Sequence, residues 1–251
     1  MPIEVFCRKE VKYWTRVELY PEIEKELLEH MVLDEYNHKV PFYPICNLYY
    51  DTPTNQLIRN SLDKPKYKEK LRLRCYGVPE EDTLVYMEIK KKYRGMVSKR
   101  RTRIALRDAY AYIGGAPMPI MPYTNVQIAK ELDWFLKVHG PLYPKTVVQY
   151  NRRAYFGKTD RNVRVTFDTD ILTRRYDVDP SLGIYGEPLL PEGYMIMEVK
   201  VPTKVIPVWL VDILSKFDLR HKSMSKYGME YRKFLRESKE DKDVRINDAN
   251  I

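Results

Sequence analysis

A Glu-x-Lys motif occurs three times in stretches with the composition of β-strands, as Glu10-Val11-Lys12, Glu88-Ile89-Lys90 and Glu198-Val199-Lys200. A fourth stretch, Arg72-Leu73-Arg74, has the same alternation of charged and apolar residues. Residues two apart in a strand point to the same face, so each motif places two charges on one face and an apolar residue on the other. A sheet made of such strands needs a hydrophobic core against one face. Its other face needs water or a charged ligand.

The composition narrows the class of protein. A chain of 251 residues forms one large domain or two small ones. No apolar run approaches the roughly 20 residues of a membrane span, and Met1-Pro2-Ile3-Glu4 lacks the profile of a signal peptide. Cys7, Cys46 and Cys75 are odd in number and have no CxxC spacing, so neither a disulfide framework nor a zinc site is indicated. We therefore expect free thiols in a reducing compartment, and a cytoplasmic location.

The formal net charge of +9 favours an anionic partner, either nucleic acid, a membrane surface or a polyphosphorylated ligand. Charge alone does not separate these partners from a basic surface that has none. The placement of the charge is more informative, because many basic residues alternate with apolar ones inside strand-like segments. A charged face of a sheet is therefore a better candidate for the binding surface than a basic tail.

The pattern along the chain predicts an α+β fold. Predicted strands cover residues 3–13, 45–50, 68–76, 84–92, 97–106, 145–155, 163–168, 171–176 and 195–201. Predicted helices cover residues 21–32, 55–62, 126–136, 206–217 and 225–237. Hairpin-like spacing favours an antiparallel sheet over a doubly wound one, and closure into a β-barrel would remove its free edges. We expect a single domain over residues 1–237 and a loose polar tail over residues 238–251.

A single charged strand face is most often solvated and carries cross-strand ion pairs. Here the charges recur from strand to strand: Arg8, Glu10 and Lys12; Arg72 and Arg74; Glu88 and Lys90; Lys99, Arg101 and Arg103; Glu198 and Lys200. Arginine dominates the set and suits bidentate binding of phosphate. If the apolar faces lie outward under the helices, these side chains line a charged tunnel. Such a lumen requires an anion or ordered solvent, because unpaired buried charges are costly.

A set of motifs follows the same order along the chain as in a known family. They are Lys12-Tyr13-Trp14, Tyr49-Tyr50-Asp51, Arg59, Leu71-Arg72-Leu73-Arg74-Cys75-Tyr76-Gly77, Glu88-Ile89-Lys90, Tyr150-Asn151-Arg152-Arg153-Ala154-Tyr155, Val163-Arg164-Val165 with Asp168-Thr169, Met197-Glu198-Val199-Lys200 and Ser225-Lys226-Tyr227. In this order they resemble the polyphosphate polymerase domain of the vacuolar transporter chaperone (VTC) family, among the CYTH-like triphosphate tunnel metalloenzymes. None is specific alone, but together they span about Val5 to Tyr227.

The resemblance implies an antiparallel tunnel with helices outside that binds ATP and inorganic polyphosphate together with Mn²⁺ or Mg²⁺. It implies catalytic contacts to phosphate from Arg72, Arg74, Lys90, Arg152, Arg164 and Lys200. Further phosphate contacts are implied for Lys12, Arg59 and Lys226, and for one of Lys99, Arg100 and Arg101. It implies that Glu198 holds the metal, assisted by Glu88 or Glu10. Ser223, beside Lys222, stands where the eukaryotic domain has a lysine, which leaves one contact at the tunnel end open.

The function expected from this resemblance is transfer of the γ-phosphoryl group of ATP to a growing polyphosphate chain. If water is the acceptor instead, the same lining makes a tripolyphosphate or nucleoside triphosphate hydrolase. A basic module that only binds polyphosphate or nucleic acid is a further alternative, in which bases stack on Tyr49, Tyr50, Tyr67, Tyr76, Tyr86 or Tyr150. Sheet packing is the ordinary role of such tyrosines, and we expect no nucleic-acid partner. The resemblance suggests a stand-alone domain of prokaryotic type, with any membrane-protein partner encoded elsewhere.

Overall fold

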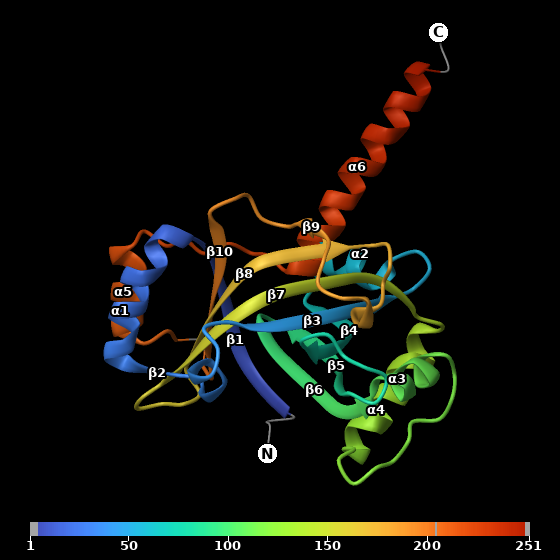
Figure 1. The fold of residues 1–251 in the computed structure, drawn as a ribbon, viewed down its shortest axis with the longest axis horizontal. Coiled ribbons are helices and arrows are strands. Elements are labelled where there is room, and N and C mark those ends of the chain that lie inside the picture. The colour runs from blue at the N-terminus through green and yellow to red at the C-terminus, as the bar shows by residue number, and fades with distance from the viewer. Residues whose placement is uncertain (1–4, 204, 249–251) are drawn as a thin grey trace.

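The computed structural model describes residues 5–203 and 205–248 (Figure 1). Its strands are β1 (Val5–Arg16), β2 (Met31–Leu33), β3 (Tyr43–Asp51), β4 (Tyr67–Tyr76), β5 (Leu84–Tyr93), β6 (Met96–Ala105), β7 (Tyr143–Gly157), β8 (Arg164–Arg174), β9 (Glu187–Pro188) and β10 (Tyr194–Val201). Its helices are α1 (Tyr20–His30), α2 (Gln56–Leu62), α3 (Leu106–Ile113), α4 (Val126–His139), α5 (Val208–Lys216) and α6 (Lys226–Asp248). Short 3-10 turns are η1 (Val17–Leu19), η2 (Glu35–His38) and η3 (Pro180–Leu182).

The strands form one antiparallel sheet that closes on itself. Its order is β2-β7-β3-β4-β5-β6-β1-β10-β8-β9, and an additional pairing joins β7 to β8. The strands from β7 through to β8 therefore form a ring, with β2 and β9 as short extensions at its seam. The predicted α+β class and antiparallel closure are confirmed. Closure satisfies the edge groups of the long strands, which an open sheet of this size would expose.

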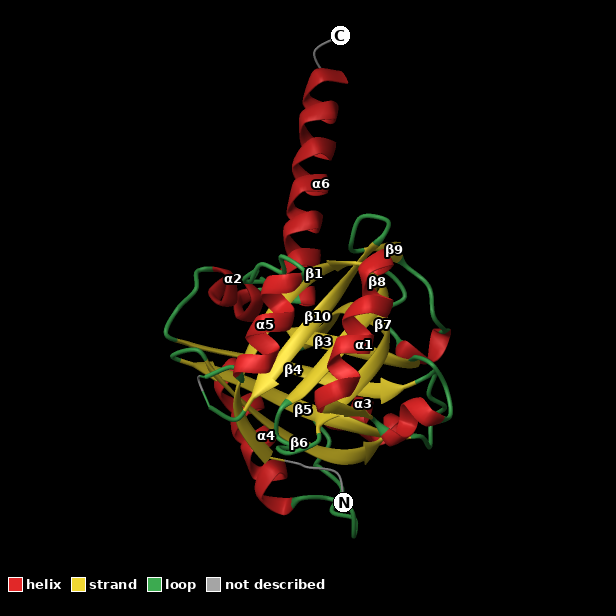
Figure 2. Ribbon diagram, turned by 90° about the vertical axis from the view of Figure 1, so that its left-hand side faces the viewer, coloured by secondary structure: helices red, strands yellow, loops and turns green. Residues whose placement is uncertain are grey.

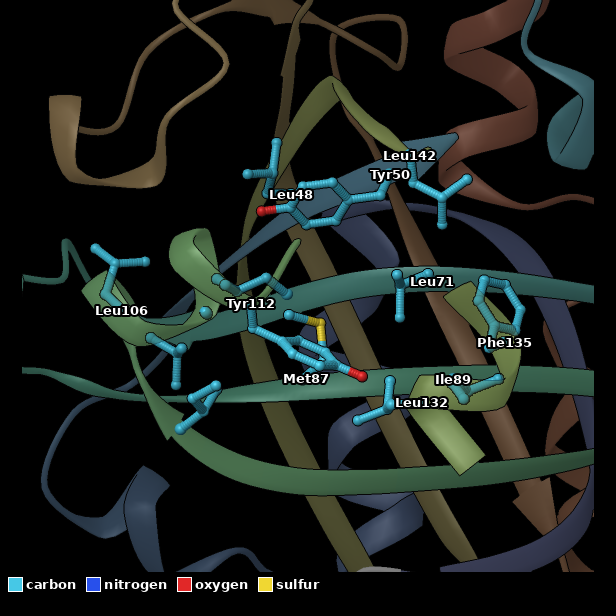
Figure 3. Packing of buried hydrophobic residues seen from close by; sticks show 14 of the residues in the cluster. Leu48, Tyr50, Leu71, Met87, Ile89, Leu106, Tyr112, Leu132, Phe135 and Leu142 are labelled. Atoms are coloured by element: carbon cyan, nitrogen blue, oxygen red, sulfur yellow. The ribbon is translucent and has the colours of Figure 1, made fainter. Parts of the chain in front are cut away.

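The strand register sends charged side chains into the ring and apolar ones out of it. Arg72 on β4 pairs with Glu88 on β5, which pairs with Arg101 on β6. The residues that alternate with these along each strand, such as Leu71 and Ile89, are fully buried on the outer face. There they join the core that α3 and α4 cover, with Leu132 and Phe135 of α4 among its members (Figure 3). The hydrophobic core of this half lies outside the ring, as the alternation predicts.

A second outer core covers the other side of the ring. Phe167 of β8 and Val199 of β10 are fully buried there, with Ile23 and Leu27 of α1 and Leu210 of α5. Helices α1 and α5 lie side by side over these strands (Figure 2). Burying such large aliphatic and aromatic side chains contributes about 1.5–3 kcal/mol each, so the two outer cores supply the main stabilisation of the ring.

Helices α2 and α6 meet at one end of the ring, where Asp51 joins them. Oδ1 of Asp51 accepts from the backbone N of Leu57 at 2.8 Å, and Oδ2 accepts from that of Ile58 at 2.9 Å. Oδ2 also accepts from the hydroxyl of Tyr227 in the first turn of α6, at 3.0 Å. One buried carboxylate thus satisfies free N–H groups of α2 and anchors the start of α6. From there α6 projects away from the ring (Figure 1).

Three sequence expectations need correction or completion. Residues 163–168 and 171–176 do not form two strands, because β8 continues through Asp170, which adopts φ 50° opposite a register shift between Gln149 and Asn151. In the sequence, the residues around Asp170 resemble a turn between two strands. In the structure, Asp170 with its positive φ marks a bulge inside one strand. The expected loose tail is helical as far as Asp248, because α6 does not end at Glu237. Residues 1–4 and 249–251 lie outside the described residues.

The long helix α6 is the only one near membrane-spanning length, and it is rich in charge. Across residues 5–203 and 205–248, none of the helices has the combination of length and apolar character that crossing a bilayer requires.

Candidate active site in the ring

The ring surrounds a cavity of about 210 Å³ whose lining is strongly basic. Fifteen lysines and arginines contribute to this lining, but only three glutamates do. These charged residues come from β1, β4, β5, β6, β7 and β10, from the segment after α2, and from α6 and the segment before it. Such an excess of buried positive charge is unfavourable unless an anion compensates it. The cavity is therefore suited to a polyanionic ligand.

Most of the predicted site residues meet in this cavity. The lining includes Glu10, Lys12, Arg72, Arg74, Lys90, Lys99, Arg152, Glu198, Lys200 and Lys226. They come from strands that are far apart in sequence, and only closure of the sheet brings them together. The structure thus assembles the predicted set, while the role of each residue stays a prediction.

Other predicted residues lie elsewhere. Arg59 is exposed on α2 and does not belong to the cavity lining in the described part of the chain. Nε of Arg100 lies 3.4 Å from Oε2 of Glu131 on α4, outside the ring. The guanidinium of Arg101 lies 4.5 Å from the ring centroid of Tyr86. Of the three adjacent candidates on β6, only Lys99 lines the cavity.

Arg164 lies on the interior face of the ring but outside this cavity lining. Its Nη2 donates to Oδ2 of Asp34 at 3.1 Å, and its guanidinium lies 4.6 Å from the ring centroid of Phe156. Burial lowers the pKa of Arg164 from its ordinary value. This arginine therefore sits toward one end of the ring rather than at the centre of the cavity.

Glu88 is enclosed by basic side chains and has no exposed surface. Its Oε2 accepts from Nε and Nη2 of Arg72 at 2.8 and 2.6 Å, and its Oε1 accepts from Nζ of Lys99 at 3.0 Å. Burial opposes ionisation, but Lys99, Arg72, and further arginines hold the pKa of Glu88 well below its ordinary value. Glu88 does not line the cavity and its oxygens are engaged in this way, so it is better suited to orienting Arg72 and Lys99 than to holding a metal.

Glu10 and Glu198 alternate with lysines along and across the adjacent strands β1 and β10. In the register Glu10 pairs with Lys200, and Lys12 pairs with Glu198. Oε1 of Glu198 lies 3.2 Å from Nζ of Lys12, and its Oε2 lies 2.9 Å from Nζ of Lys200. Oε2 of Glu10 lies 2.7 Å from Nζ of Lys90. Both carboxylates belong to the lining of the cavity.

The ionisation of these carboxylates follows from their neighbours. Burial would raise the pKa of Glu10 and so would the charge of Glu198, but Lys90, Lys12 and Arg8 outweigh both, leaving it at about 2. Burial likewise opposes ionisation of Glu198, yet Lys12 and Lys200 hold its pKa well below the ordinary value. Both groups are therefore anionic at neutral pH, as ligands of a divalent cation must be.

The donor set fits a divalent cation that is shared with a phosphate ligand. No group of three or more His, Cys, Asp or Glu side chains within residues 5–203 and 205–248 is arranged to hold a metal by protein atoms alone. Mg²⁺ is usually bound by one or two carboxylates together with substrate phosphates and water, rather than by a complete protein cage. Glu10 and Glu198 supply such a pair of carboxylates on adjacent strands.

Asp168 was not among the predicted site residues, although it contacts two residues of the cavity lining. This buried carboxylate accepts from Nε and Nη2 of Arg152 at 2.6 and 2.8 Å and from Nζ of Lys226. Burial would raise its pKa, but Arg152 and Lys226 lower it. Asp168 thereby fixes an arginine of β7 and the first residue of α6 beside the same cavity. A signal for it is present in the sequence, because Asp168 shares a strand face with Arg164.

Lys68, Lys70 and Lys92 also line the cavity and were not predicted as site residues. Lys70 is buried, and its Nζ donates to the hydroxyl of Ser225 at 3.2 Å. No carboxylate in the described part of the chain forms an ion pair with Lys70. Burial, Lys90 and Lys68 lower its pKa well below the ordinary value. The run Lys68-x-Lys70-x-Arg72-x-Arg74 places all four on one strand face, a pattern that the sequence already displays.

Two tyrosines hold the arginines of the cavity in place. The hydroxyl of Tyr49 accepts from Nη1 of Arg72 at 3.2 Å, and that of Tyr150 accepts from Nη2 of Arg74 at 3.1 Å. Tyr50, by contrast, belongs to the outer core. Of the tyrosines considered for base stacking, these three are therefore committed to hydrogen bonding or packing.

The comparison with protein families agrees with this geometry. A family model described as the VTC domain matches residues 7–235 of the chain. The chain belongs to the VTC domain family. The match includes every strand that forms the ring and most of the charged lining, so the resemblance inferred from the ordered motifs is confirmed for this VTC-domain chain.

Curated relatives of this VTC-domain chain include subunit 4 of vacuolar transporter chaperone complexes. The Trypanosoma brucei brucei subunit is 25% identical over 255 residues, covering 84% of the chain and 32% of that protein. The Schizosaccharomyces pombe subunit is 23% identical over 253 residues, covering 84% and 35%. The chain thus spans about a third of the length of the curated relatives that it matches.

Solved structures share the fold at low sequence identity. A candidate adenylate cyclase from Bacillus halodurans superposes with a TM-score of 0.55 at 14% identity, covering 89% of this VTC-domain chain and 96% of that protein. A candidate adenylyl cyclase from Hippeastrum, which has a dominant triphosphatase activity, superposes with a TM-score of 0.52 at 12% identity, covering 88% and 92%. At this identity the likeness concerns the fold.

Proposed function

We propose that this VTC-domain chain is a metal-dependent polyphosphate polymerase that transfers the γ-phosphoryl group of ATP to a growing chain of inorganic polyphosphate. The observation that carries the proposal is the enclosed cavity, in which fifteen basic side chains face only three glutamates. A linear polyphosphate supplies negative charge at every unit and fits such a passage. Membership of the VTC domain family supports the same activity.

In the proposed step, an oxygen of the terminal phosphate of the acceptor attacks the γ-phosphorus of ATP. The bond from that phosphorus to the β–γ bridging oxygen breaks, ADP leaves, and the acceptor gains one phosphate. The electron pair of the broken bond stays with ADP. No nucleophile from the protein is required, because phosphoryl transfer is accelerated mainly by positioning and charge neutralisation.

The residues of the cavity divide into roles within this proposal. Arg72, Arg74 and Arg152 hold phosphate oxygens, each oriented by a buried hydrogen-bond partner. Lys12, Lys90, Lys99, Lys200 and Lys226 supply further positive charge along the lining. Glu198, with Glu10 beside it, would hold Mn²⁺ or Mg²⁺, which supplies charge neutralisation to the phosphates when bound. Glu88 acts through Arg72 and Lys99 as a positioning residue.

Hydrolysis is the second candidate, because the triphosphatase from Hippeastrum shares the fold. Water would then replace the phosphate acceptor, and the same cationic lining would serve it. The two activities differ only in the nucleophile, so the products separate them.

The deciding experiment incubates the purified chain with ATP, Mn²⁺ and a tripolyphosphate primer, and resolves the products on a gel that stains polyphosphate. We expect chains longer than the primer together with ADP. The Lys90→Met variant should lose this product, whereas Lys91→Met, on the outward face of the same strand, should retain it. Release of ADP and inorganic phosphate alone would establish hydrolysis and overturn the polymerase.

A further inference from the structure

The two ends of the ring interior are chemically different. Along the interior face of β4 the order is Lys68, Lys70, Arg72, Arg74 and Tyr76, so lysine marks one end of this strand and tyrosine the other. The antiparallel strand β5 repeats the pattern in reverse, from Tyr86 to Lys92. We call the end with Lys68, Lys70, Lys92 and Lys226 the lysine mouth. The end with Tyr36, Tyr43, Tyr76 and Tyr86 is the tyrosine mouth.

The tyrosine mouth holds a continuous row of aromatic rings. The ring centroids of Tyr36 and Tyr43 are 6.2 Å apart, those of Tyr43 and Tyr76 are 6.1 Å apart, and those of Tyr76 and Tyr86 are 6.2 Å apart. The planes of successive rings are inclined by 58°, 50° and 85°, so none of the pairs is stacked face to face, and Tyr76 and Tyr86 meet edge to face. Tyr36 is 73% exposed and Tyr76 is 50% exposed. These two side chains thus keep a large exposed surface at this mouth.

Interior-facing aromatic rings near the lysine mouth are already covered. Nζ of Lys222 lies 3.9 Å from the ring centroid of Trp14, and Tyr49 stacks on Tyr227 with centroids 4.6 Å apart. The ring of Tyr150 has Nζ of Lys226 at 4.3 Å. At the tyrosine mouth the guanidinium of Arg101 lies 4.5 Å from the ring centroid of Tyr86, but Tyr36 and Tyr76 are largely exposed. The exposure of interior-facing aromatic side chains therefore distinguishes the two mouths.

Arginines beside the tyrosine row have donors that no protein acceptor satisfies. Nε of Arg103 on β6 and Nε of Arg164 on β8 are buried and have no hydrogen-bond partner within residues 5–203 and 205–248. Arg103 pairs with Tyr86 in the register, and Arg152, near Arg164, pairs with Tyr43. A buried donor without an acceptor costs about 1–3 kcal/mol. A phosphate group at this mouth would provide the missing acceptors.

We infer that the nucleobase of the triphosphate substrate binds at the tyrosine mouth, stacked on the exposed rings of Tyr36 and Tyr76 in this row, with its phosphates directed inward past Arg103 and Arg164. This inference rests on the proposed function, which supplies the nucleotide. Aromatic faces beside unsatisfied arginine donors are the features that bind a base and its attached phosphates. The reacting phosphates then lie at the central arginines, and polyphosphate extends toward the lysine mouth.

The test compares the binding of ATP with that of inorganic tripolyphosphate, which lacks a base, by titration calorimetry with Mn²⁺ present. In Tyr76→Leu we expect the affinity for ATP to fall about tenfold while the affinity for tripolyphosphate is unchanged. Tyr36→Leu, at the most exposed ring of the row, should act in the same direction. The matched control is Tyr93→Leu, which is 53% exposed at the opposite end of β5 and should change neither affinity.

Equal affinities of Tyr76→Leu and wild type for ATP would overturn the inference, as would a selective loss of ATP binding in Tyr93→Leu. A parallel loss of both ligands in Tyr76→Leu would also overturn it, because only a contact to the base discriminates between them. Failure of the proposed function would give a different result. The wild type would then bind both ligands but form no polyphosphate, and the binding comparison would still locate the base.

Discussion

Arg72 and Glu88 face each other across β4 and β5, and both the Nε and the Nη2 of Arg72 donate to Oε2 of Glu88. Lys99 occupies the other oxygen from the opposite neighbouring strand. The carboxylate is thus the centre of a buried cluster and holds two cations at the wall of the cavity. Glu88 was expected to assist a metal. We propose from these contacts that it keeps Arg72 and Lys99 in position.

The first prediction concerns the stability that Glu88 provides. Glu88→Gln leaves Arg72 and Lys99 buried without a counter-charge, and we expect the free energy of unfolding to fall by about 3 kcal/mol. The matched control is Glu131→Gln, which removes the more exposed ion pair with Arg100 and should cost less than about 1 kcal/mol. Urea unfolding of the three proteins measures both changes. Similar losses of unfolding free energy in Glu88→Gln and Glu131→Gln would show that burial does not make the Glu88 cluster more important for stability.

The second prediction separates metal binding from anion binding. Glu198→Gln removes the charge of the expected metal ligand but retains its size, so turnover of ATP with Mn²⁺ should fall by about 100-fold or more. Tripolyphosphate binding without metal should be retained or strengthened, since a negative charge leaves the cavity. Glu69→Gln is the control. This glutamate lines the same cavity, but its Oε1 lies 2.7 Å from Nε2 of His139. Unchanged turnover in Glu198→Gln would remove Glu198 from the metal site.

The third prediction concerns Lys70, a buried lysine that has no carboxylate partner in the described residues. Lys70→Met should raise the free energy of unfolding at neutral pH by about 1 kcal/mol and shorten the polyphosphate product. Lys90→Met should instead lower stability, because it leaves Glu10 with fewer counter-charges. Thermal unfolding and product gels test the two effects. A Lys70→Met protein that is less stable than wild type would contradict the reasoning.

Lys70 also predicts proton uptake on ligand binding. Its pKa lies well below the ordinary value in the free protein, and a bound polyanion raises it again, so the lysine takes up a proton. Affinity for tripolyphosphate should accordingly weaken as pH rises through the alkaline range. Calorimetry in buffers of different ionisation enthalpy measures the proton count, which should decrease in Lys70→Met. An identical proton count in variant and wild type would assign the uptake to another group.

The fifth prediction follows from the pKa of Glu10, which is lowered from 4.5 to about 2. A carboxyl group with a lowered pKa contributes stability that is fully present above pH 4.5 and is lost as pH falls toward 2. The stability difference between wild type and Glu10→Gln, on the order of 3 kcal/mol at neutral pH, should therefore shrink in acid. Urea unfolding between about pH 7 and pH 3 tests this. Exposed Glu18→Gln controls for the change of net charge.

The sequence was sufficient to predict which face of each strand is charged, because alternation along a strand depends only on local geometry. The same local pattern does not identify contacts that form only when the sheet closes. The interaction of Asp168 with Lys226 joins β8 to α6 across 58 residues, and no spacing rule reports it. Arg100 illustrates the reverse case, since its position in a basic run does not reveal that α4 presents Glu131 to it from outside the ring.

Arg59 and Glu88 show two different limits of prediction from motifs. Arg59 was selected by the family order, yet the short helix α2 turns it to solvent. Glu88 was selected by chemical type, and its role depends on the register that places Arg72 on one side of it and Arg101 on the other. A residue type indicates the chemistry that is available. Only the packing determines which partner a side chain contacts.

The cavity inside the ring gathers positive charge that the acidic groups of its described lining do not balance. A ligand that binds only the folded state raises stability by RT ln(1 + [L]/Kd), so a polyanion bound in the cavity would stabilise the folded ring. The folded population should therefore rise with the concentration of phosphate polymers. If the proposed function holds, a cell that exhausts its polyphosphate would hold a less stable form of the enzyme that makes it, and resistance to proteolysis would report the level of the ligand.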